Sequence, residues 1–176
     1  MPDNILVTYS SRTGSTIGVA EAIGKILAEN GAKADVLPMQ DVNDLTQYDA
    51  VVAGSAIQSA QWLPEAMQFL KRFQSELAQK PVAIFSVCMT LAMPNGEKYR
   101  NGVAQWLEPV RQFVTPIDEG YFAGVLDIIK VPGFANRIKF RLSVSFGIWK
   151  PGDHRNWDEI NAWAKNLKKL LEEKYS

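Results

Sequence analysis

Short apolar runs alternate with longer segments of helical periodicity along the whole chain. Runs rich in β-branched and aromatic residues predict five strands, at 5–9, 34–37, 50–54, 81–87 and 117–123. Between the strands, apolar residues recur every three or four positions, which predicts helices over 16–30, 64–77 and 103–114. The last helical pattern is the clearest, because Asn156 can cap a helix whose apolar face includes Ile160, Trp163 and Leu167.

Strands that alternate with helices predict one α/β domain, since crossover helices must cover both faces of a parallel sheet. No linker, internal repeat or low-complexity stretch divides residues 1–176. Five strands of this kind suit a doubly wound parallel sheet of order 2-1-3-4-5. An insertion at about 125–152 separates the fifth strand from the last helix and is longer than an ordinary connection.

Composition and charge narrow the possible function classes. The chain has 176 residues, of which 47% are hydrophobic and 22% charged, as in an ordered globular protein. Lys plus Arg (19) balances Asp plus Glu (19), so no overall field favours a nucleic-acid partner. A single cysteine and a single histidine exclude a disulfide framework and a multi-cysteine metal site. Because we find neither a signal-peptide pattern nor an apolar run of about 18 residues, we expect a cytoplasmic protein that crosses no membrane.

The loop after the first predicted strand carries the clearest chemical signal. Ligands of such sheets bind at the carboxyl ends of the strands, near the first strand. Amides at a helix N-terminus bind anions, hydroxyls add donors, and a glycine lets the backbone approach closely. An ordinary serine-rich turn is the alternative explanation, while a P-loop and a dinucleotide fingerprint are both absent from this loop. The candidate phosphate-binding residues are Ser10, Ser11, Arg12, Thr13, Gly14, Ser15 and Thr16.

Residues 11–16, Ser-Arg-Thr-Gly-Ser-Thr, match the Ser/Thr-x-Thr-Gly-x-Thr loop with which flavodoxins hold the phosphate of FMN. The segments 54–57, 85–90, 122–125 and 153–157 resemble the branch of this family that contains the bacterial menaquinone-dependent protoporphyrinogen IX dehydrogenases. The resemblance spans nearly the whole chain. It implies a flavodoxin-like fold, FMN as cofactor and an oxidoreductase that passes electrons from a porphyrinogen to a quinone in heme biosynthesis.

The resemblance also implies where the flavin ring would lie. Flavodoxins bind the ring with backbone groups of the loops after the third and fourth strands, and an aromatic side chain covers one face. Trp62 is our candidate for that aromatic, unless it packs against Met67 at the start of the next helix. Cys88 is either a redox thiol or, as we favour, a small buried residue that offers its backbone to the ring. The ring-binding candidates are Ser55, Ala56, Ile57, Trp62, Ser86, Val87, Cys88, Met89 and Thr90.

The insertion combines apolar and basic residues. On one helical face lie Phe134, Ile138, Leu142, Phe146 and Trp149. Only Asp127 and Asp153 oppose the basic residues of this region, which are Lys130, Arg137, Lys139, Arg141, Lys150 and Arg155. The segment either covers the core with a solvated basic face, or presents cations and aromatics to a porphyrin's carboxylates or to anionic lipid at the inner face of the membrane.

Three other functions stay open at this point. The chain could be an electron carrier without its own substrate, an NAD(P)H-dependent flavin or quinone reductase, or a flavodoxin fold without cofactor. Carriers that dock on basic partners are generally acidic, whereas this chain is neutral. No residue is assigned a catalytic role and no metal is expected, because the redox chemistry would belong to the cofactor. We therefore expect an FMN-dependent oxidoreductase whose substrate is a small molecule, a porphyrinogen or a quinone.

Overall fold

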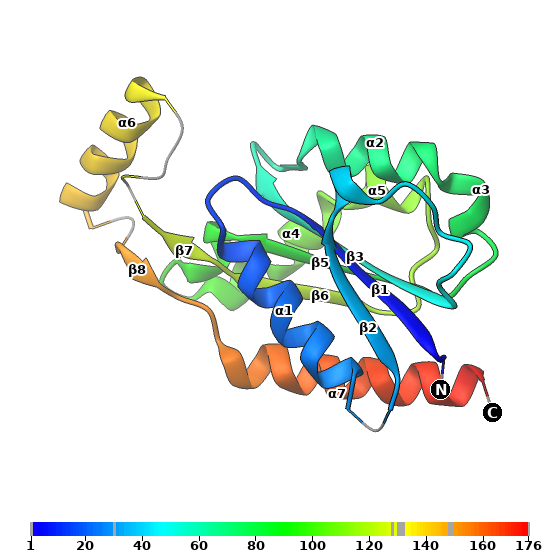
Figure 1. Cartoon of the computed structure of the whole chain (residues 1–176). Helices are drawn as coiled ribbons and strands as arrows, with labels where there is room; N and C mark the ends of the chain where they lie inside the picture. Colours follow the sequence, from blue (N-terminus) through cyan, green and yellow to red (C-terminus); the bar gives the residue numbers. More distant parts are fainter. Residues whose placement is uncertain (1, 30, 128, 130–132, 148–149, 176) are drawn as a thin grey trace.

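The computed structural model describes residues 2–29, 31–127, 129, 133–147 and 150–175 (Figure 1). Parallel strands form its central sheet in the order β2-β1-β3-β5-β6, and the short β4 pairs antiparallel with β3. The sheet thus confirms the predicted doubly wound, flavodoxin-like order of the five parallel strands. Its strands are β1 (Asn4–Ser10), β2 (Lys33–Pro38), β3 (Ala50–Gln58), β4 (Gln61–Trp62), β5 (Val82–Cys88) and β6 (Glu119–Ala123).

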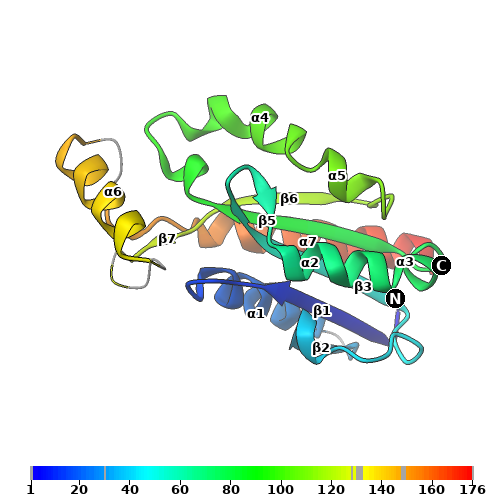
Figure 2. The same cartoon turned by 90° about the horizontal axis from the view of Figure 1, so that it is seen from above.

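Helices cover both faces of this sheet, as Figures 1 and 2 show. One face carries α1 (Ser15–Leu27) and α7 (Trp157–Lys174). The other face carries α2 (Pro64–Arg72), α3 (Gln74–Leu77), α4 (Arg100–Gln105) and α5 (Glu108–Arg111). Short 3₁₀ turns complete the connections: η1 (Met39–Asp41), η2 (Met89–Ala92) and η3 (Gly96–Tyr99).

Two apolar cores hold the layers together, one on each face of the sheet. Successive side chains of a strand point to opposite faces. On β1, therefore, Ile5 and Val7 pack toward α1 and α7, whereas Leu6 packs toward the helices on the other side. All three are fully buried, which explains why the central strands read as continuous apolar runs rather than as alternating patterns.

The structure shortens or divides several predicted helices. The helix predicted at 16–30 ends at Leu27, and Gly31 follows in the left-handed region with φ +99°. The pattern over 64–77 is divided at Phe73 between α2 and α3. The pattern over 103–114 is divided between α4 and α5, where a proline stands in the first turn of α5 and cannot donate a backbone hydrogen bond. Asn156 caps α7 as predicted, its side chain accepting from the Glu159 amide at 3.2 Å.

The insertion forms an arm, which we define as residues 125–153. Its two short strands, β7 (Val125–Leu126) and β8 (Gly152–Asp153), pair antiparallel and carry α6 (Phe134–Ser145). In both views α6 stands away from the sheet and its covering helices (Figures 1 and 2). The helix therefore does not cover the core, which removes one of the two explanations for its apolar stripe. Lys130 and Trp149, two members of the predicted group, lie outside the described residues.

Candidate functional site

A cavity of about 280 Å³ opens at the carboxyl ends of β1, β3, β5 and β6. Four segments far apart in the sequence meet there: the loop after β1, the turn between β3 and β4, the end of β5 and the segment after β6. The volume lies near the lower end of typical small-molecule sites, which are roughly 300–1,000 Å³. The lining of this main cavity comprises Arg12, Thr13, Ser15, Ala56, Ile57, Gln58, Ser59, Ala60, Leu63, Val87, Cys88, Met89, Thr90, Trp106, Gly124, Val125, Leu126 and Asp127.

The loop after β1 has the geometry of an anion site. Gly14 adopts φ +92°, a conformation that side-chain-bearing residues rarely take, and its amide donates to Ser11 Oγ at 3.1 Å. The helix α1 begins at the next residue, and its first turn contains no acidic side chain. Amides at a helix N-terminus lack partners within the helix, and the helix dipole favours negative charge there. The first turn of α1 therefore offers an N-terminal anion site without an acidic side chain of its own, and its Ser15 lines the main cavity.

One buried hydroxyl in this turn lacks a partner. Thr16 is fully buried, and its Oγ1 forms no hydrogen bond among the described residues. A buried polar group without a partner destabilises the fold by roughly 1–3 kcal/mol. Phosphate oxygens accept hydrogen bonds strongly, so a phosphate bound at this turn would satisfy the hydroxyl. The residues present therefore fit a phosphate monoester.

Arg12 separates the main cavity from a second cavity of about 220 Å³ and lines both. Its guanidinium donates to both carboxylate oxygens of Glu65, at 2.6 and 3.0 Å. These hydrogen bonds lower the pKa of Glu65 below its ordinary value. Ser10 and Ser11 line the second cavity rather than the main one. The structure therefore brings only part of the predicted phosphate loop, Arg12, Thr13 and Ser15, to the wall of the main cavity.

Apart from Trp62, the predicted ring-binding residues fall into two groups. Six of them line the main cavity: Ala56, Ile57, Val87, Cys88, Met89 and Thr90. Ser55 and Ser86 are instead buried beneath its lining. The hydroxyl of Ser55 accepts from the Leu63 amide at 3.1 Å and so ties the end of β3 to the start of α2. These two serines support the wall, and the other six form it.

Trp62 lies in the core rather than on the cavity. It is 3% exposed, and its Nε1 donates to Ser86 Oγ at 2.8 Å. Met67 packs against the same apolar cluster. This position agrees with the packing alternative raised for Trp62 and leaves its ring without access to a bound ligand.

The aromatic residue that does line the main cavity is Trp106, which sequence reasoning missed. It is half-buried and follows the last residue of α4. The sequence pattern shows it as a neighbour of the apolar stripe that runs through Val103 and Leu107. Nothing in that pattern connects it to the strand ends. The one signal in the sequence was that Trp106, a large aromatic residue, lies beside the apolar stripe of its helix rather than on it, which indicates a role other than core packing.

Burial raises the pKa of the Cys88 thiol above its ordinary value. Cys88 is 5% exposed, and the raised pKa keeps its thiol protonated near neutral pH. A protonated thiol is a poor nucleophile, which favours the interpretation of Cys88 as a small buried residue. Its place at the end of β5 still brings its backbone to the cavity wall.

The root of the arm is part of the site. Residues 124–127 line the main cavity, and a Cβ on Gly124 would approach Ser15 Oγ to 3.4 Å. Two residues after β8, Arg155 forms an ion pair with Asp153 at 2.6 Å and stacks over the Trp157 ring at 4.4 Å. Its Nη1 also lies 3.5 Å from the Ser15 carbonyl oxygen. The segment that directly follows the arm therefore contacts the first turn of α1, which is the predicted phosphate site.

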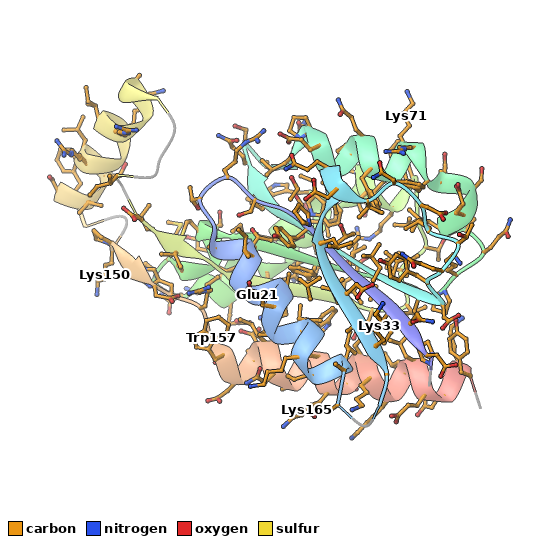
Figure 3. All side chains as sticks on the ribbon, in the orientation of Figure 1. Glu21, Lys33, Lys71, Lys150, Trp157 and Lys165 are labelled. Carbon is orange, nitrogen blue, oxygen red and sulfur yellow. The ribbon has the colours of Figure 1, made fainter. Side chains whose placement is uncertain are left out.

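Gly18 makes room for this contact. A Cβ added at Gly18 would lie 2.5 Å from Arg155 Nη1, closer than side chains tolerate. In Figure 3, Trp157 marks the start of α7 beside α1. Any side chain at position 18 would therefore displace the guanidinium from the first turns of α1.

Comparison with known proteins identifies both the fold and distant relatives. Residues 6–147 match the family model described as a flavodoxin domain. A protein of Leishmania major, named protoporphyrinogen IX dehydrogenase (quinone), is 32% identical over 88 residues, which are 48% of this chain and 38% of that protein. A protein of the same name from Escherichia coli strain K12 is 29% identical over 91 residues, 51% of this chain and 50% of that one. The chain spans half or less of the length of these curated relatives.

Solved structures agree on the fold. The oxidised Flavodoxin 2 of Bacillus cereus superposes with a TM-score of 0.61 at 18% identity, covering 95% of this chain and 99% of that one. A flavodoxin from the domain Archaea gives a TM-score of 0.58 at 16% identity, with coverage of 96% and 99%. Within the described residues, no helix has the length and apolar character needed to cross a membrane.

Proposed function

This chain belongs to the flavodoxin domain family, and from that premise we propose that it is an FMN-dependent oxidoreductase that passes electrons from a porphyrinogen to a quinone. The observation that carries the proposal is the turn at Gly14–Thr16, where a left-handed glycine precedes a helix N-terminus and the buried Thr16 hydroxyl has no partner among the described residues. Thr13 and Ser15, beside it in the chain, line the main cavity. The choice of substrates is supported by the two relatives named protoporphyrinogen IX dehydrogenase (quinone).

The residues of the site suit the two ends of FMN. The amides and hydroxyls at Thr13–Thr16 would hold its phosphate, and the backbone at Ala56–Ile57 and Val87–Thr90 would hold its ring. When bound, FMN supplies the redox chemistry. The chain itself would bind and orient the cofactor, and the apolar side chains of Leu63, Val125 and Leu126 form part of the cavity wall.

An electron carrier without its own substrate is the second candidate. The observation that favours it is the fold, since flavodoxin structures superpose on this chain over almost its full length. The absence of net charge argues against it, because carriers that dock on basic partners are generally acidic.

Reduction under anaerobic conditions distinguishes the two functions. We expect the purified protein to be yellow and to release FMN on denaturation. Protoporphyrinogen IX, but not NADPH, should remove the absorbance band of the oxidised flavin, and protoporphyrin fluorescence should appear. A quinone without an isoprenoid tail, such as menadione, should then restore the flavin absorbance. Bleaching by dithionite alone would contradict the dehydrogenase and support the carrier, and bleaching by NADPH would support a flavin or quinone reductase. A protein that binds no FMN at all would overturn every flavin-dependent function.

Substitution of Trp106 should weaken FMN binding, whereas substitution of Trp62 should lower the stability of the fold. We expect Trp106→Ala to weaken FMN binding about threefold to tenfold, because an aromatic contact contributes about 0.5–1.5 kcal/mol beyond buried area. Trp106→Phe should retain most of the affinity. Trp62→Phe should leave the affinity unchanged but destabilise the fold by about 1–2 kcal/mol, because the Ser86 hydroxyl loses its partner. Quenching of flavin fluorescence measures the affinity, and urea unfolding measures the stability. A weaker affinity in Trp62→Phe, with none in Trp106→Ala, would contradict this assignment.

A further inference from the structure

The helix α6 exposes large apolar side chains to solvent. Ile138, Leu142 and Phe146 are 42%, 54% and 78% exposed, and Ile129 at the root of the arm is 78% exposed. Residues spaced by four lie on one face of a helix, so the first three form a continuous stripe. Figures 1 and 2 show this helix clear of the rest of the molecule in two perpendicular views. We call Ile138, Leu142 and Phe146 the arm stripe.

Exposed cations flank the arm stripe on both sides. Lys139 follows Ile138 and Arg141 precedes Leu142, and successive residues of a helix are about 100° apart, so the two cations fall on opposite flanks. Lys150, labelled in Figure 3, stands at the foot of the arm and is also exposed. The sequence from 133 to 150 contains no Asp or Glu. The arm thus joins an apolar stripe to positive charge in a chain that is neutral as a whole.

We propose that the arm docks the protein on an anionic phospholipid surface. An interfacial helix buries its apolar face at the boundary between headgroups and acyl chains, and its flanking cations contact anionic headgroups. Long basic side chains reach the headgroups while their methylene stems stay near the apolar layer. The composition of the arm meets each of these requirements.

The size of the arm favours a lipid surface over a second protein. A helix of 12 residues is about 18 Å long and roughly 10 Å wide, so one face covers on the order of 180 Å². A stable protein interface buries about 800 Å² on each partner. A lipid surface has no such threshold, because binding grows with each apolar side chain inserted and each anionic headgroup contacted.

The root of the arm links docking to the main cavity. Residues 125–127 belong both to the arm and to the cavity lining. Docking would therefore hold the cavity close to the lipid layer. If the proposed function is correct, docking brings the site close to the bilayer, in which lipid-soluble quinones dissolve. The docking itself does not depend on the proposed function.

Vesicle sedimentation tests the proposal with the full chain. We expect the wild type to sediment with vesicles of equal parts phosphatidylglycerol and phosphatidylcholine, and to remain in solution with phosphatidylcholine alone. Leu142→Glu with Phe146→Glu should weaken binding to the anionic vesicles about tenfold or more. The matched control is Ser75→Glu with Gln79→Glu, which adds the same charge at exposed positions in and just after α3, at the other end of the molecule (Figure 1). The control should bind nearly as the wild type does.

Two further variants separate the apolar and electrostatic contributions. Leu142→Ser with Phe146→Ser removes apolar side chains without changing charge, and should also weaken binding. Lys139→Gln with Arg141→Gln should reduce the preference for phosphatidylglycerol, as should high salt. Equal sedimentation of the wild type and the Leu142→Ser, Phe146→Ser variant would overturn the proposal, and so would a wild type that does not sediment with anionic vesicles.

Other measurements on the same samples keep the proposals distinct. Light scattering that shows a dimer dependent on Leu142 and Phe146, without vesicle binding, would assign the stripe to a second copy and overturn lipid docking. FMN content and menadione-dependent recolouring of every variant report on the proposed function. A wild type that holds FMN and reacts with menadione but ignores vesicles overturns only the docking. One that sediments with anionic vesicles but holds no FMN overturns only the proposed function.

Discussion

Replacing Thr13 and Thr16 together with alanine is expected to weaken FMN binding by about a hundredfold or more. Thr13 lines the main cavity, and Thr16 carries the buried hydroxyl that has no partner among the described residues. A hydrogen bond to a charged group contributes about 1.5–3 kcal/mol, so the loss of two removes about 3 kcal/mol or more. Each 1.4 kcal/mol or so corresponds to a tenfold change in affinity. Titration of the FMN-free variant, followed by flavin fluorescence, measures the effect.

Thr8 supplies the matched control for this experiment. Its Oγ1 is also buried without a partner among the described residues, but it lies within β1, outside the predicted phosphate loop and away from the N-terminus of α1. Thr8→Ala makes the same chemical change in the middle of the sheet and should leave the affinity for FMN unchanged. An unaltered affinity in the Thr13, Thr16 double variant would show that the phosphate is held elsewhere. An equal loss in Thr8→Ala would show that the effect comes from general destabilisation.

Phe85→Ala is expected to cause the largest loss of stability. Phe85 is fully buried in the centre of β5, and its ring lies 6.5 Å from the Phe122 ring and 6.4 Å from the Trp163 ring. Removal of a buried phenylalanine ring destabilises proteins by about 3–5 kcal/mol, through lost transfer energy and an unfilled cavity. Urea unfolding of the FMN-free protein measures this loss, because bound ligand would add its own stabilisation. Phe85→Leu should fold even where Phe85→Ala does not, with a smaller loss.

Gly54 tests the same packing from the opposite strand. It pairs with Phe85 across β3 and β5, and a Cβ at Gly54 would lie 2.0 Å from Phe85 Cζ. Gly54→Ala should therefore destabilise the wild type by about 1–3 kcal/mol, but should have little effect in a Phe85→Ala background, where the ring is gone. Additive losses at Gly54 and Phe85 would contradict the contact.

Phe146→Ala removes an exposed ring and should change the free energy of unfolding by no more than about 0.5 kcal/mol.

The positions of the strands and of the hydroxyl-rich turn could be predicted from the sequence because both depend on local patterns. Buried parallel strands are apolar throughout, and a hydroxyl-rich turn around Gly14 directly follows such a strand. Trp62 and Trp106 show where local patterns fail. Each stands near a predicted helix, but only the tertiary packing decides that Trp62 turns into the core and Trp106 toward the main cavity.

The position of α6 away from the core could likewise not be predicted from the sequence. Its stripe of Ile138, Leu142 and Phe146 has the spacing of a helix that packs on a core, and a helix bound to a partner has the same spacing. The two differ only in where the chain carries the helix. The pairing of β7 with β8 makes that difference, and each of these strands has only two residues, too few for a recognisable sequence pattern.

The contact between Arg155 and the first turn of α1 limits how this chain can be shortened. A chimaera in which a tight turn replaced residues 125–153 would lose the carboxylate of Asp153 that fixes the guanidinium. The Arg155 side chain, which occupies the space beside Gly18, would then no longer be held in place. The excised piece would also take with it three residues of the cavity wall. Grafting the arm onto another flavodoxin therefore requires the transfer of Gly18 and residues 153–157 as one unit.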